Sequence, residues 1–295
     1  MRSMTYEEYK QLEGLTSSQI ADFANWQQNI PPAITAVDAL RRGQRFEECI
    51  RMKFDKNYTE TFCVLPDGPS TPDDFLEIID LIKDGTPLAH FYKYTQKGDL
   101  NKTYKARHWW LDKIKAGEVD IDKPFIQYED QLRIDNAVEK LIRMPIDLLN
   151  ITVEELLSDG YWSVPIQWEE DGILKKGLID FIGNFDGTLQ HVDFKSTANK
   201  SNFYNHLYSR YRYQERHYTH GMRSFIKKRQ PLTMIFLVGV LEPPHLPFSQ
   251  HLDLNEKMTT YADNQYAVSC LRCQAWINQG RPESGYLEQK PYTWR

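Results

Sequence analysis

The sequence has little cysteine, no long hydrophobic run and no excess of positive charge. Four cysteines in 295 residues are too few for a disulfide scaffold, which favours a reducing cytoplasm. The longest apolar run, MIFLVGVL at 234–241, is too short to cross a bilayer. The polar beginning, MRSMTYEEYKQLEG, shows no secretory signal. A formal net charge of −5 argues against a protein that coats nucleic acid through bulk electrostatics.

The composition is that of a globular protein with a few local concentrations of basic residues. A hydrophobic content of 41%, with 13% aromatic residues, is sufficient for a packed core. The basic residues gather in ALRRGQR (39–45), SRYRYQER (209–216) and KKR (227–229). For KKR a solvated helix face is the preferred interpretation. The other clusters leave room for an enzyme whose positive charge is concentrated at one site.

The period of the apolar residues changes near the middle of the chain. Helical spacing predicts helices at 15–29, 33–54, 105–117 and 120–145. Strand-like segments follow at 160–170, 173–183 and 189–197, then an aromatic-rich helix at 202–228, a buried strand at 232–240 and a closing helix at 257–280. This order predicts one α/β domain over 1–295, mainly helical in 1–150 and with an α/β core in 151–295. Its central mixed sheet should be flanked by helices.

Two strand-like segments are joined by Asp186-Gly187, which is a strong signal for a two-residue type I′ hairpin turn. Such a turn fixes the register of the two strands. Counting outward from the turn pairs Phe185 with Thr188, Asn184 with Leu189, Ile182 with His191, and Asp180 with Asp193.

This register predicts a charged patch on one face of the hairpin. Directly opposed residues share a face with Cβ atoms about 5 Å apart, so the carboxylates of Asp180 and Asp193 should meet. Lys195, two residues beyond Asp193, returns to the same face because strand side chains alternate. Val192 and Phe194 should then point into the core.

The predicted face can be read in two ways. Two adjacent carboxylates repel, and Mg²⁺ would relieve this because it prefers carboxylate oxygen and keeps several waters. Lys195 would then orient or deprotonate a water that attacks a phosphodiester. The alternative is a surface hairpin in which Lys195 bridges two solvated carboxylates. A bulge at Gly183 or Asn184 would break the register altogether.

The segments LID and VDFK together resemble the core motif of the PD-(D/E)xK nucleases, here as Asp180 followed by Asp193-x-Lys195. The helical segment YQERHYTHG is similar to the Q-x-x-x-Y motif of the phage and RecB-like exonuclease branch, which gives Gln214 and Tyr218. The chain is therefore similar to that branch at two separate motifs.

A third motif lies upstream, where RRGQRFEEC is similar to the G-x-x-x-(E/H) helix motif and gives Gly43 and Glu47. Over about residues 15–290 the spacing is most similar to the exonuclease VIII (RecE) family, with specificity only at the motifs. Two positions depart from that family. Asp193 stands where many members have Glu, and Glu47 is the residue of lambda-type exonucleases, where the RecE family has His.

The resemblance implies a restriction-endonuclease-like core and a metal-dependent DNA exonuclease. It would act 5′→3′ on double-stranded ends and make single-stranded tails for recombination. Mg²⁺, or Mn²⁺, would be held by Glu47, Asp180, Asp193 and the carbonyl of Phe194, and Lys195 would activate water. The alternatives are an endonuclease, a nuclease subunit of a larger complex, or a DNA-binding module with a decayed site.

The resemblance also implies roles in DNA binding. Gln214 would orient the lysine or contact the DNA backbone, and Tyr218 lies one helical turn beyond it on the same face. Arg45 and Arg212 are possible phosphate contacts, although simple exposed charge is the preferred interpretation of each. Glu48 is expected to face solvent. The implied partners are double-stranded DNA ends, a single-strand annealing protein and further copies of the chain in a ring, in the cytoplasm of a bacterium or a phage-infected cell.

Two other patterns invite a metal or DNA interpretation. Cys270 and Cys273 raise an iron–sulfur cluster, but the related nucleases use one cysteine before the core and three after it. Here two precede and two follow, so helical packing is favoured. His217 and His220 lack a spacing suited to zinc. The tandem Trp109-Trp110 is interpreted as core, although tryptophans can stack on bases.

Overall fold

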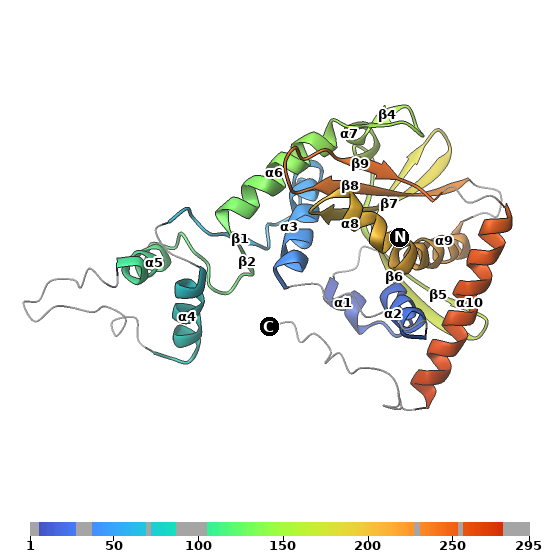
Figure 1. Ribbon diagram of the computed structural model, residues 1–295, viewed down its shortest axis with the longest axis horizontal. Coiled ribbons are helices and arrows are strands. Elements are labelled where there is room, and N and C mark those ends of the chain that lie inside the picture. The colour runs from blue at the N-terminus through green and yellow to red at the C-terminus, as the bar shows by residue number, and fades with distance from the viewer. Residues whose placement is uncertain are drawn as a thin grey trace, which may run out of the picture. The chain divides into compact units, whose positions relative to one another are not determined.

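The structure is a computed structural model that describes residues 6–27, 37–68, 72–86, 105–226, 231–252 and 256–279 (Figure 1). The chain divides into two compact units. One is Ala36–Val138, and the other combines Met1–Thr35 with Glu139–Arg295. The interpretation of 1–295 as a single nuclease domain stays a prediction.

The unit Ala36–Val138 is built mainly from helices. Its core contains Phe75, Trp110 and Leu111, of which Trp110 packs on Phe75 with ring centroids 4.7 Å apart. Trp110 is thus core, as the sequence predicted. The elements of this unit are α3 (Val37–Phe54), β1 (Cys63–Val64), α4 (Pro72–Lys83), α5 (Lys105–Lys115), β2 (Phe125–Ile126) and α6 (Tyr128–Ile142), whose last turn belongs to the other unit. Strands β1 and β2 pair in parallel.

The larger unit is organised around a five-stranded mixed sheet with the order β5-β6-β7-β8-β9. Neighbouring strands are antiparallel except β7 and β8, which are parallel. The predicted α/β fold, with a central mixed sheet flanked by helices, is confirmed. The strands are β5 (Gly160–Glu170), β6 (Ile173–Phe185), β7 (Thr188–Thr197), β8 (Leu232–Val240) and the unpredicted β9 (Phe248–Gln250).

Helix α9 (Arg212–Phe225) covers one face of this sheet and packs on β5, β6 and β8, while α2 and α10 pack against α9 (Figure 1). The sequence predicted one helix over 202–228. Instead α8 (Lys200–His206) passes through a π-helical turn, η3 (Leu207–Tyr211), into α9. The remaining elements are α1 (Tyr6–Gln11), α2 (Ser17–Gln27), β3 (Pro145–Ile146), β4 (Ile151–Thr152), α7 (Val153–Leu157) and α10 (Glu256–Asn278).

Two apolar clusters of described residues contribute to the core of the larger unit. The first lies between the sheet and α9 and contains Ile166, Phe203 and Phe236 among others. The second lies between α2, α9 and α10 and includes Cys270 and Cys273, each at most 2% exposed. The cysteine pair therefore packs in the core, as the favoured interpretation held. All four cysteines are free thiols.

The hairpin of β6 and β7 has the predicted turn and register. Asp186 and Gly187 have φ angles of 47° and 73°, and positive φ at both central residues is the signature of a type I′ turn. The ladder contains the pairs Phe185–Thr188, Asn184–Leu189, Gly183–Gln190, Ile182–His191 and Phe181–Val192. No bulge interrupts it at Gly183 or Asn184.

Among the described residues, no helix is long and apolar enough to span a membrane.

Candidate active site

The regular alternation of strand β5 is interrupted at Ser163, which has a φ angle of 47°. Val164 packs in the cluster under α9. The ring of Trp162, two residues earlier, instead contacts the ring of Phe181 and stacks on that of Phe194. The ring centroids are 4.9 Å and 5.8 Å apart, respectively. Because residues two apart in a regular strand share a face, the strand has changed faces at Ser163.

Strand β6 changes faces at the neighbouring position, Asp180. Ile179 and Ile182 both pack under α9, although a regular strand places residues three apart on opposite faces. At this break the carboxylate of Asp180 hydrogen-bonds the backbone of β7. Oδ2 of Asp180 accepts the backbone N–H of Phe194 at 2.8 Å. The hydrogen-bonded ladder to β7 ends one pair before Asp180 and Asp193.

Asp193 is buried on β7, with 2% of its surface exposed, and forms two polar contacts. Its carboxylate pairs with the ammonium group of Lys195 and accepts a hydrogen bond from Nε2 of Gln214. The placement of Asp193 and Lys195 on one face, which the alternation predicted, is thus observed. Val192 and Phe194 on the other face are buried, also as predicted.

The electrostatics of this group reflect burial and opposite charge. Burial raises the pKa of Asp193, against the opposing influence of Lys195 and Gln214. Burial by itself would lower the pKa of Lys195, but the charges of Asp193 and Asp180 and the proximity of Tyr211 raise it. Lys195 is therefore a cation that lies within the field of both carboxylates.

Helix α9 brings Gln214 and Tyr218 to the same place, because residues four apart share a helix face. Tyr218 is 8% exposed and hydrogen-bonds Gln214. Burial raises the pKa of its phenol, and the charges of Asp193 and Asp180 raise it further. The sheet makes room for the ring at Gly177, where an added Cβ would lie 2.8 Å from Cε1 of Tyr218.

For two of the expected metal ligands, Glu47 and the carbonyl of Phe194, the role in metal binding stays a prediction. Glu47 is half-buried on α3, in the unit Ala36–Val138, whereas Asp180 and Asp193 belong to the larger unit. Its role as a ligand stays a prediction. Phe194 donates its backbone N–H to Asp180, and the role of its carbonyl is likewise untested.

The structure corrects the expectation for Glu48 and gives no support to a phosphate contact by Arg45. Glu48, expected to face solvent, is 3% exposed and accepts the N–H of Thr61 at 2.6 Å. Arg45 is 4% exposed and pairs with Glu48 at 2.5 Å and with Glu60 at 2.6 Å. Its Nε donates to Gln131 at 2.8 Å. The guanidinium is therefore fully engaged inside its own unit.

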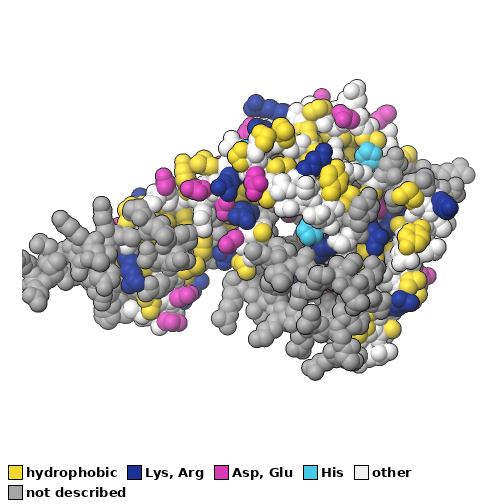
Figure 2. Space-filling view, viewed as in Figure 1, with side chains coloured by type: hydrophobic (Ala, Val, Ile, Leu, Met, Phe, Trp, Pro, Cys, Tyr) yellow, Lys and Arg dark blue, Asp and Glu magenta, His cyan; other side chains and the backbone are white. Residues whose placement is uncertain are grey.

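Arg212, the other expected phosphate contact, lies at the start of α9. Its guanidinium carbon is 4.9 Å from the ring centre of Tyr213, and Nη2 donates to the hydroxyl of Tyr213 at 3.3 Å. A role in DNA binding stays a prediction. On the face drawn in Figure 2, Lys and Arg side chains are interspersed with Asp and Glu.

The donor set of the site is compatible with a hard divalent cation. Among the described residues, no group of three or more His, Cys, Asp or Glu side chains is placed to hold a metal ion. Asp180 and Asp193 supply two carboxylates. Mg²⁺ keeps several of its waters and commonly binds through only one or two carboxylates, so two aspartates suit it.

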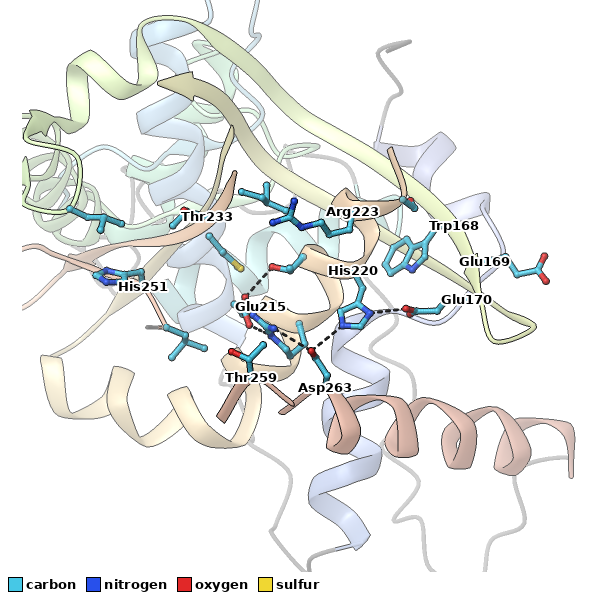
Figure 3. A pocket seen from close by; sticks show the side chains of 17 residues that line it. Trp168, Glu169, Glu170, Glu215, His220, Arg223, Thr233, His251, Thr259 and Asp263 are labelled. Atoms are coloured by element: carbon cyan, nitrogen blue, oxygen red, sulfur yellow. Dashed lines mark hydrogen bonds and ion pairs between the residues drawn. The ribbon is translucent and has the colours of Figure 1, made fainter. Parts of the chain in front are cut away.

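A separate pocket of about 800 Å³ lies in the larger unit, beside the part of α9 that follows the site (Figure 3). None of the sequence-predicted site residues lines it. His220 connects two of its walls, with Nδ1 2.7 Å from Glu170 and Nε2 3.1 Å from Asp263. His217 is core, with its ring nitrogens 2.8 Å from Tyr266 and from the Lys176 carbonyl.

Tyr211 also lies at the site, although it belongs to none of the sequence motifs. Its ring lies beneath the Lys195 ammonium, with Nζ 5.4 Å from the ring centre. The available signal was its position three residues before Gln214 and seven before Tyr218, which places all three on one helix face.

Comparisons with known proteins add little beyond these observations. No family model matches the chain, and no curated protein matches it. Among solved structures, the chain is similar to a candidate exonuclease from Eubacterium rectale, with a TM-score of 0.48 and 13% identity over 96% of this chain and 89% of that one. It is also similar to the protein SSO0001, with a TM-score of 0.29 and 11% identity over 82% of this chain and 96% of that one.

Proposed function

We propose that the chain is a metal-dependent deoxyribonuclease of the PD-(D/E)xK kind. One observation carries the proposal. Asp193 is buried against Lys195 and Gln214 at the point where β6 and β7 stop pairing and Asp180 takes the N–H of Phe194. A solvated surface hairpin would leave these carboxylates in water, whereas Asp193 has lost nearly all of its exposed surface.

In this proposal Asp180 and Asp193 hold Mg²⁺ or Mn²⁺, and Glu47 and the Phe194 carbonyl are further ligands. When bound, the cation supplies Lewis-acid stabilisation of the charge that develops on the phosphate. The two carboxylates would hold the cation in a defined place, because the Phe194 N–H fixes Asp180 and Gln214 fixes Asp193.

Lys195 would position the attacking water in this scheme, and the proton of that water would pass to solvent because a protonated ammonium cannot accept it. In the structure its ammonium is held by Asp193. If Asp193 held a cation, its ion pair with Lys195 would weaken, and the ammonium would be able to hydrogen-bond the water and to stabilise the anionic phosphate. Gln214 donates to Asp193 and thereby keeps the carboxylate oriented during this exchange.

The finer parts of the proposal rest on the resemblance of the motifs. They are 5′→3′ exonuclease action on duplex ends, a ring of several copies around the DNA, cooperation with a single-strand annealing protein, and DNA contacts from Gln214, Tyr218 and Arg212. The net charge of −5 favours enclosure over diffuse attraction, since a chain with this balance gains little from bulk electrostatics.

The proposal is tested with end-labelled linear duplex and covalently closed circular duplex, each incubated with Mg²⁺ or with a chelator across a salt series. We expect Mg²⁺-dependent release of nucleotides from the linear substrate only. Once loaded, a threaded enzyme should resist moderate salt better than its loading step does.

Comparable cutting of the closed circle would instead identify an endonuclease. If neither the linear nor the circular substrate were degraded with Mg²⁺ or Mn²⁺, the nuclease proposal would be contradicted. The matched control variant is Asp186→Asn, which keeps a favourable turn residue on the same hairpin and is separated from Asp180 and Asp193 by the five pairs of the ladder.

A further inference from the structure

Tyr211 occupies an unusual position in the backbone, as the last residue of the π-helical turn η3. Such turns are rare and occur frequently at functional sites, because the wider turn shifts the phase of the residues that follow. Here the turn precedes α9, whose face toward Asp193 carries Gln214 and Tyr218. Tyr211 lies on that face, at the edge nearest the turn.

The ring of Tyr211 is fixed by buried aromatic neighbours. It packs on Phe203 with ring centroids 5.1 Å apart and on Phe236 at 5.5 Å. Both neighbours are at most 1% exposed, so they are part of the core. Packing against these buried residues therefore fixes the position of the Tyr211 ring.

One face of this ring is turned to Lys195, with Nζ 5.4 Å from the ring centre. An ammonium within about 6 Å of a ring centre is attracted by the negative charge of the aromatic face. The Lys195 ammonium therefore contacts the Asp193 carboxylate and the Tyr211 ring at the same time.

Among the described residues, the hydroxyl of Tyr211 forms no hydrogen bond. The contact with Lys195 is made by the ring alone, so removal of the hydroxyl should leave the contact intact.

We infer that Tyr211 is a positioning residue for Lys195. Its ring holds the ammonium in place when the Asp193 carboxylate binds a metal cation instead. This inference rests on the proposed nuclease function. A lysine has a long stem with many rotamers, so an ammonium released from Asp193 would otherwise spread over several positions. A fixed aromatic face restricts it and thereby raises the fraction of molecules that are ready to react.

The test uses the full chain and compares Tyr211→Leu, Tyr211→Phe and Tyr204→Leu. Tyr204 is the matched control, because it packs against the same apolar cluster and lies 5.8 Å beneath a different ammonium, that of Lys200. With linear duplex and Mg²⁺, we expect Tyr211→Leu to lower kcat about tenfold with KM unchanged. Tyr211→Phe and Tyr204→Leu should stay within about twofold of the wild type.

Thermal unfolding of each variant identifies loss of folding, and Tyr211→Met replaces Tyr211→Leu if the latter does not fold. Equal kcat for Tyr211→Leu, Tyr211→Phe and the wild type would overturn the inference. So would a large loss with Tyr211→Phe, because the hydroxyl would then be the active part. Failure of the wild type itself to cleave DNA would overturn the proposed function first, and the role of Tyr211 with it.

Discussion

Lys195 is the residue on which the chemistry of the site depends most. Its ammonium brings a positive charge close to both Asp180 and Asp193. In a metal-free molecule this charge offsets two carboxylates. In the proposed reaction the same charge acts on water and phosphate.

Lys195→Ala is expected to lower kcat for DNA cleavage by at least about 100-fold while Mg²⁺ binding is retained. The reason is that the lysine acts on the water and does not hold the cation. Cleavage rates and calorimetric Mg²⁺ titration measure the two effects separately. The matched control, Lys200→Ala, removes an exposed lysine at the start of α8 and should leave both unchanged. Cleavage by Lys195→Ala at the wild-type rate would remove the role assigned to Lys195.

The burial of Arg45 could not be predicted from the sequence. Three of its polar contacts are with Glu48, Glu60 and Gln131. Two of these are distant along the chain, and neither is marked by any motif. The cluster of basic residues around it favoured an exposed charge. Tertiary packing instead buried Arg45 and Glu48 as a pair.

Arg45→Ala is therefore expected to lower the free energy of unfolding by about 3 kcal/mol, because it leaves Glu48 buried without its cation. Urea denaturation measures this change. Arg42→Ala is the control, since Arg42 pairs with Asp130 at 3.4 Å with a third of its side chain exposed. That change should cost at most about 1 kcal/mol. Equal stabilities of the two variants would contradict the buried network.

At the scale of elements, the hairpin of β6 and β7 could be predicted because its turn and its alternation agree. Asp186-Gly187 specifies the turn, and the turn specifies the register. The end of the ladder could not be predicted. The face change depends on positive φ at Ser163, a residue type that gives no signal for it.

The turn itself provides a clean stability test. Gly187→Ala should lower the free energy of unfolding by about 1 kcal/mol, because an L side chain disfavours a φ of 73°. An added Cβ meets no atom within 4 Å there, so crowding contributes nothing. Asp186→Asn should be neutral, since Asn also accepts positive φ. A neutral Gly187→Ala would show that the type I′ turn is not maintained in solution.

The helix over 202–228 illustrates the same limit. The existence of this helix could be predicted from aromatic residues at helical spacing. The π-helical turn at Leu207–Tyr211 could not be predicted in this way. A π turn arises where packing on both sides fixes the helix in different phases. The sequence of one helix does not contain that information.

For the larger unit as a whole, stability should depend on pH through His220, which links β5 to α10 on the wall of the pocket (Figure 3). Burial lowers the pKa of His220, but the hydrogen bonds to Glu170 and Asp263 outweigh it and raise the pKa. The hydrogen bond from His220, together with the nearby ammonium of Lys175, lowers the pKa of Glu170 to about 2. Lys175 on β6 and Arg216 on α9 complete the charged surroundings.

Because the folded pKa of His220 is raised, its contribution is full below the unfolded value of about 6.5 and is lost as the pH rises through the folded value. Because the pKa of Glu170 is lowered, its contribution is present above about 4.5 and is lost as the pH falls toward 2. His220→Gln should therefore flatten the decrease in unfolding free energy between about pH 6 and pH 8. His251→Gln, another pocket residue, is the control. An unchanged pH profile in His220→Gln would contradict the link.

Across the whole chain, the α/β architecture and the convergence of Asp193, Lys195 and Gln214 followed from periodicity, one turn and two motifs. The role of Glu47 stays a prediction, because this residue lies in the other compact unit.

The central claim is that Asp193 belongs to a metal-dependent nuclease site, and one comparison tests it most directly. The wild type and Asp193→Asn, a change of one carboxylate oxygen to an amide nitrogen, are incubated with the same end-labelled linear duplex and Mg²⁺. We expect nucleotide release by the wild type and a rate at least about 100-fold lower for Asp193→Asn at equal folded concentration. Equal rates for the two proteins would contradict the claim.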